Sequence, residues 1–189
     1  MQLIFPGSYW RAVPYPHAQA PDIDMSALNI AQTSQYMSEL NQYRNIGHGV
    51  SARIWAELLD VNPPNPFTDR DVADIVAICI FRNIVPPLTD PNILYFVIMP
   101  PGINYTDNNF IGVHTYCTIP PFLWNRVHYA WVTNDNTLED ITRIFSHELV
   151  EAVTDPEGND IVGTAGTCSQ VGCVKLLMCV KVNMVTLGG

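Results

Sequence analysis

The chain has 189 residues, of which 48% are hydrophobic and 14% charged, and its formal net charge is −9. This composition excludes a largely disordered chain, and the few, scattered Lys and Arg residues argue against nucleic acid and anionic membranes as partners. The length fits one domain, or at most one domain with a tail. The sequence contains no run of about 18 apolar residues, so it predicts no membrane-spanning helix. Residues 1–6 lack the basic start and long apolar core of a signal peptide.

The N-terminal part of the chain predicts two strands around a helix. Residues 2–5 are apolar and end at a Pro-Gly pair, which is typical of a short strand. A helix is expected from about residue 25 to 43, with Asp24 or Ser26 as its cap, because apolar residues recur on one face. Weak alternation over residues 50–59 suits a second strand.

The middle of the chain predicts a helix and a buried strand. Thr68, followed three residues later by Asp71, is typical of a helix start, and the helix is expected to reach about Asn83. Residues 93–99 are apolar on both faces, which favours a central strand. The expected inward side chains of the helix are Val72, Ile75, Val76, Cys79 and Ile80.

Two further strands and a last helix follow. Residues 110–118 and 127–132 are strand candidates, and Thr137 with Asp140 is typical of a cap for a helix over residues 137–155. Leu138, Ile141, Ile144, Phe145, Leu149 and Ala152 would give this helix an apolar side. The order of elements predicts an α+β (layered) fold, with a mixed sheet of about five strands backed by helices.

The last helix carries a motif with metal-site spacing. His147 and Glu151 are four residues apart, so they share a helix face and can hold one ion together. Glu148 lies beside them, where it can take a proton from a metal-bound water as general base. This is the zincin pattern H-E-x-x-H with Glu in the second ligand position (HExxE). A His and two Glu on a helix more often belong to a solvated face, but this helix has a long apolar side, and His147 and Glu151 would be costly to bury there without a ligand.

A zinc site needs three protein ligands plus water, and the third ligand stays open. Glu157 and Asp160 lie in the segment after the helix and are the first candidates. His114, from a predicted strand, could reach the metal or a substrate oxyanion, and we include it with the catalytic candidates. Asp155 is either a further ligand or only the residue that ends the helix. His48, His128 and Cys168 are weaker candidates.

The segment Ser-His-Glu-Leu-Val-Glu-Ala-Val-Thr-Asp-Pro, residues 146–156, resembles a motif of the Phi-1/Exordium-like family and its bacterial and fungal relatives. Looser similarity lies in residues 34–43, in residues 112–114 and around residues 129–130. The resemblance covers residues 1 to about 160. It implies a zincin-like fold and a divalent metal, and it allows secretion, but it does not define a reaction.

The end of the chain departs from that resemblance. Residues 161–189 contain no Asp, Glu or His, although relatives carry an acidic segment there that could complete the site. We therefore expect one zincin-like domain over residues 1–160 and a segment of divergent composition over residues 161–189.

These observations lead to three functional hypotheses. The first is a zinc-dependent hydrolase, most simply a metallopeptidase-like protein that acts on a peptide or small molecule. The second is a metal-dependent lyase, cyclase or oxygenase acting on a small molecule. The third is a non-catalytic secreted interaction protein with a vestigial metal site.

Overall fold

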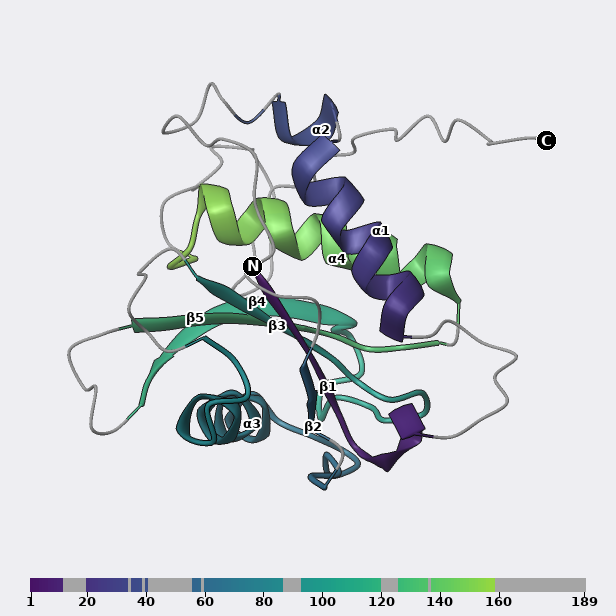
Figure 1. The fold of residues 1–189 in the computed structure, drawn as a ribbon, viewed down its shortest axis with the longest axis vertical. Helices are drawn as coiled ribbons and strands as arrows, with labels where there is room; N and C mark the ends of the chain where they lie inside the picture. The colour runs from purple at the N-terminus through teal and green to yellow at the C-terminus, as the bar shows by residue number, and fades with distance from the viewer. Residues whose placement is uncertain are drawn as a thin grey trace, which may run out of the picture.

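The computed structural model describes residues 1–11, 20–33, 35–38, 40, 56–58, 60–86, 93–119, 126–135 and 137–158. It combines helices with a mixed sheet, which agrees with the general α+β class expected from the sequence (Figure 1). The strands are β1 (Gln2–Pro6), β2 (Ala56–Leu58), β3 (Leu94–Ile98), β4 (Gly112–Thr118) and β5 (Arg126–Val132). The helices are a 3₁₀ turn η1 (Ser8–Arg11), then α1 (Ala20–Thr33), α2 (Gln35–Ser38), α3 (Asp69–Phe81) and α4 (Leu138–Thr154).

The strands lie side by side in the order β2-β1-β3-β5-β4. All neighbours are parallel except β4, which runs antiparallel to β5 at one edge. Strand β3 is buried along its whole length between β1 and β5, as expected for a strand that is apolar on both faces. The inner face of β4 meets a helix from the C-terminal part of the described chain.

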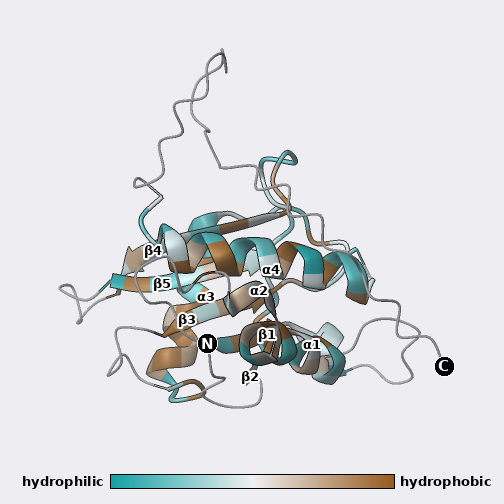
Figure 2. Ribbon diagram, turned by 90° about the horizontal axis from the view of Figure 1, so that it is seen from above, coloured by the Kyte–Doolittle hydropathy of each residue, from teal (hydrophilic) through white to brown (hydrophobic). Residues whose placement is uncertain are grey.

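Helices cover both faces of the sheet (Figure 1). Helices α1 and α4 pack on one face and share a core with alternate residues of β3 and β5, among them Phe96 and Ala130. Helix α3 covers the other face, where Tyr95 and Trp131 are buried. Helix α4 shows alternating hydrophobic and hydrophilic bands, as expected for a helix with one face against the sheet (Figure 2).

Local sequence signals account for the starts of α3 and α4. Thr68 and Asp71 form a complete capping box, in which each side chain accepts from the other residue's backbone N–H. Thr137 caps α4 by accepting from the backbone N–H of Asp140. The five inward residues expected for α3 are all buried. These caps satisfy backbone donors that a helix start otherwise leaves unpaired.

The first helix begins earlier than its sequence pattern predicted. It starts at Ala20 rather than about residue 25, so Asp24 is a buried residue inside α1 and not its cap. Pro21 in the first turn is the start signal that the prediction missed, because Pro favours that position. Strand β2 occupies residues 56–58, while residues 50–55 and 59 of the strand predicted there lie outside the described residues.

The carboxylate of Asp69 ties the start of α3 to the sheet. Its Oδ1 accepts from the indole N–H of Trp131 at 2.9 Å, and its Oδ2 accepts from the hydroxyl of Tyr105 at 3.1 Å. Its backbone carbonyl also accepts from the hydroxyl of Tyr129 at 3.2 Å. The buried indole thus has a charged acceptor, which satisfies a donor that would be costly to leave unpaired.

Candidate metal site

The site forms where α4 lies against β4, and Gly112 makes the approach possible. A Cβ atom at Gly112 would lie 2.6 Å from Cγ2 of Ile144 and 2.9 Å from Oε1 of Glu148. Both distances are shorter than a normal van der Waals contact. Because Gly112 has no side chain, α4 packs directly on the strand and places Glu148 against the sheet.

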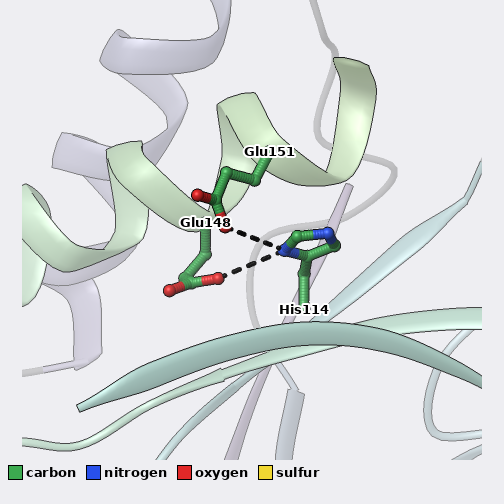
Figure 3. Close-up of side chains that lie close together, drawn as sticks. All are labelled: His114, Glu148 and Glu151. Carbon is green, nitrogen blue, oxygen red and sulfur yellow. Dashed lines mark hydrogen bonds and ion pairs between the residues drawn. The ribbon is translucent and has the colours of Figure 1, made fainter. Parts of the chain in front are cut away.

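Three side chains converge in this contact (Figure 3). His114 rises from β4 toward the helix, and Nδ1 of its ring lies 3.4 Å from Oε2 of Glu148 and 3.3 Å from Oε2 of Glu151. One potential ligand atom from each residue lies within 4.8 Å of the other two. The side chains are 8%, 3% and 15% exposed, so the cluster is largely shielded from water.

His147 lies on the outer side of the same cluster. Its Nε2 atom is 3.2 Å from Oε1 of Glu151, which agrees with the one-face relation of residues four apart. The side chain is 48% exposed, in contrast to the buried Glu148. Glu151 therefore has one carboxylate oxygen toward His147 and the other toward His114.

The electrostatics of the cluster favour a positive charge at its centre. Burial lowers the pKa of His114, but hydrogen bonds to Glu148 and Glu151 and the nearby negative charge outweigh burial and raise the pKa to about 9. Two shielded carboxylates around one imidazole need a cation to offset their charge. Either a proton on His114 or a metal ion can supply it.

The turn after α4 contacts two histidines. The carbonyl oxygen of Asp155 lies 3.1 Å from Nε2 of His114. On the neighbouring strand, burial lowers the pKa of His128, and a hydrogen bond to the backbone of Pro156 opposes that effect. The turn is therefore packed against the same sheet face as the cluster.

None of the other described sequence candidates belongs to the group of converging ligand atoms, and the rest lie outside the described residues. Glu157 forms an ion pair with Arg126 of β5. Asp155 is the residue at which α4 ends, and its backbone N–H donates to the carbonyl of Glu151. Asp160, His48 and Cys168 lie outside the described residues, as does the expected domain boundary near residue 160.

The sequence did not reveal that Glu148 would be buried. A usable signal was present, because Ile141, Phe145, Glu148 and Ala152 follow one another at intervals of three and four and so share a face. Gly112 was the second missed signal, since its role depends on a helix that approaches from a distant part of the sequence.

A scan against protein-family models, a search of curated proteins and a search of solved structures found no match to this chain. Among the described residues, no helix is both long enough and apolar enough to cross a bilayer. The residues at the β4–α4 contact are therefore the basis on which a function can be assigned.

Proposed function

We propose that the protein is a metal-dependent hydrolase with a zincin-like fold, in which a divalent ion binds between β4 and α4. Zinc is the first candidate, and a peptide or small molecule is the substrate. The observation that carries the proposal is the convergence of His114, Glu148 and Glu151, with ligand atoms within 4.8 Å of one another in a shielded place. The HExxE helix along a mixed sheet supports it as well.

The donor set fits a divalent ion. An imidazole nitrogen and carboxylate oxygens are ordinary zinc ligands, and three protein ligands leave a position for water. When bound, the ion would polarise a substrate carbonyl and lower the pKa of a bound water toward about 7. His114 would have to be neutral to ligate, so metal binding would displace its second proton.

Two assignments of the side chains are compatible with these contacts. In the first, Glu151 holds the ion together with His114 and His147, and Glu148 serves as general base: it accepts a proton from the attacking water and returns it to the leaving group. In the second, Glu148 is itself a ligand with His114 and Glu151. The first keeps the roles expected from the motif, and the second uses the three residues whose ligand atoms all lie within 4.8 Å of one another.

A Glu148→Gln variant distinguishes the two assignments. If Glu148 is the base, the variant keeps its metal and loses turnover of a peptide or ester substrate; if Glu148 is a ligand, metal affinity falls as well. Glu139→Gln is the matched control, because it makes the same change at an exposed position of the same helix.

The wild-type protein, purified without added metal, should carry about one equivalent of metal and lose thermal stability on chelation. Protein without metal, whose melting a chelator leaves unchanged, would contradict the proposal. In that case the protonated imidazole of His114 is the cation of the cluster.

A second candidate function is a metal enzyme with non-hydrolytic chemistry on a small molecule. It is favoured by the position of Glu151 between His114 and His147, because two histidines and one carboxylate form the ligand set of many non-haem iron enzymes. Anomalous-scattering maps at the zinc and iron edges would separate the candidates by identifying both the ion and its ligands.

A further inference from the structure

We propose that the turn at residues 155–158 selects the ligating atom of His114: the backbone carbonyl of Asp155 accepts a hydrogen bond from Nε2–H, which leaves Nδ1 as the atom that binds the metal. Pro156 is then a positioning residue that acts through the backbone of Asp155. This inference rests on the metal site proposed above and specifies which imidazole nitrogen of His114 binds the ion.

The hydrogen bonds of His114 determine which of its ring nitrogens bears the hydrogen. Its Nε2 atom lies 3.1 Å from the carbonyl oxygen of Asp155, and a carbonyl oxygen can only accept. Nε2 therefore bears the hydrogen. In the neutral ring the lone pair is then on Nδ1, the atom that faces the carboxylates of Glu148 and Glu151. A carbonyl that orients a ligating histidine in this way is a common feature of metal sites.

The sequence of the turn explains why this carbonyl is in place. Asp155, Pro156, Glu157 and Gly158 match the residue preferences of a type I turn, with Asp first, Pro second and Gly fourth. The backbone N–H of Gly158 donates to the carbonyl of Asp155 at 3.1 Å, which closes the turn. Gly158 has a φ of +67°, a conformation that glycine adopts without strain.

Pro156 ends the helix at the required residue. A residue before proline is disfavoured in the helical region, and Asp155 has φ −140° and ψ 68°. Its N–H still donates to the carbonyl of Glu151 at 2.8 Å, so the helix is regular up to this residue. The carbonyl of Asp155 then leaves the helical direction and accepts from His114 and Gly158.

His128 provides an internal comparison. It also interacts with this turn, through a hydrogen bond to the backbone of Pro156, whose only polar backbone group is its carbonyl. Its Nδ1 atom is buried without a hydrogen-bond partner, so the bond to Pro156 comes from Nε2. However, His128 does not belong to the group of converging ligand atoms. A substitution of His128 therefore changes a histidine that contacts the turn without removing a proposed metal ligand.

Two substitutions of His114 separate its nitrogens. The amide oxygen of an Asn can occupy the place of Nδ1, whereas a Gln reaches the place of Nε2. Zn²⁺ affinity, measured by competition with a chromogenic chelator, should fall more in His114→Gln than in His114→Asn. His128→Gln is the control and should leave Zn²⁺ affinity unchanged. Retention of Zn²⁺ by His114→Gln together with its loss from His114→Asn would overturn the inference.

A Pro156→Ala variant tests the positioning role. Because it lets the Asp155 carbonyl move away from His114, it should weaken Zn²⁺ binding by about 10–100-fold, the usual effect of losing the partner that orients a ligand, while the far-ultraviolet circular dichroism stays native. Unchanged affinity would show that the turn does not need Pro156 and would contradict its role.

The ring nitrogens can also be observed directly. In ¹⁵N-labelled, Zn²⁺-loaded protein, the imidazole spectrum of His114 should show a proton on Nε2 and a metal-bound Nδ1. Zn²⁺ bound through Nε2 would overturn this inference and leave the metal site standing. A wild-type protein that takes up no Zn²⁺ would overturn both.

Discussion

Replacing Gly112 by Ala should loosen the contact between β4 and α4. The added Cβ would lie 2.6 Å from Cγ2 of Ile144, whereas carbon atoms in contact are normally about 3.5–4.0 Å apart, so one element must move by about 1 Å. Overpacking of this kind costs about 1–3 kcal/mol. Ala also reduces the conformational entropy of the unfolded chain, which stabilises the fold by about 0.4–1 kcal/mol. This gain applies here because Gly112 does not have a positive φ, so Ala can adopt its backbone conformation. The expected net loss is about 1–2 kcal/mol in the free energy of unfolding.

Urea denaturation at equilibrium measures this loss, and thermal melting should show a decrease of about 2–4 °C per kcal/mol for a chain of this size. An Ile144→Ala change in the same chain tests the cause, because it removes the closest clashing atom. The double variant should be more stable than the sum of the two single losses predicts, by about 1 kcal/mol. Simple additivity, or a Gly112→Ala protein as stable as wild type, would refute the packing argument.

Three further changes test other parts of the structure. Asp69→Ala should lower the free energy of unfolding by about 2–3 kcal/mol in urea titrations, because the buried indole of Trp131 loses a charged acceptor. Burial raises the pKa of Asp24, so its ionisation costs stability above the pKa of the unfolded state, and that cost disappears as the pH falls below about 4. Asp24→Asn should therefore stabilise the protein at pH 7 and much less at pH 3.5, in paired thermal melts. Burial raises the pKa of Cys79 to about 12, so peptide mapping after alkylation at pH 8 should find this thiol unmodified until the protein unfolds.

Each of these expectations has a contrary result. Asp69→Ala with wild-type stability would mean that the indole N–H finds another partner at no cost. A gain from Asp24→Asn that is equal at both pH values would point to packing rather than charge. Alkylation of Cys79 in the folded protein at the rate of an exposed thiol would show that its helix opens readily.

Local signals predicted much of the fold because they act over a few residues. The capping residues Thr68 and Thr137 marked the starts of α3 and α4, and the apolar run at residues 93–99 marked the central strand. The start of α1 was missed because Asp24 resembles a cap in sequence, yet it is buried within the helix. Pro21, in the first turn of α1, was the local signal for the earlier start, whereas the burial of Asp24 depends on how the helix packs.

In the candidate site, too, contacts within one helix could be predicted from the sequence, whereas contacts between distant segments could not. Spacing predicted that His147 and Glu151 would be neighbours, and their atoms are 3.2 Å apart. Spacing could not predict how α4 is rotated on the sheet, and this rotation turns Glu148 inward and leaves His147 half exposed. The rotation depends on Gly112 and His114, which lie more than 30 residues before Glu148 in the sequence.

The burial of β3 has a consequence for the handling of the protein. Residues 93–99, Ile-Leu-Tyr-Phe-Val-Ile-Met, contain no charge and no proline, and are rich in residues that favour strands. Such a segment can stack against copies of itself in other chains when it is exposed. In the native fold, β1 and β5 occupy both of its edges, and helices cover both of its faces. Variants that detach α3 or α4 would therefore be recognised first by insolubility during expression, before any loss of secondary structure could be measured.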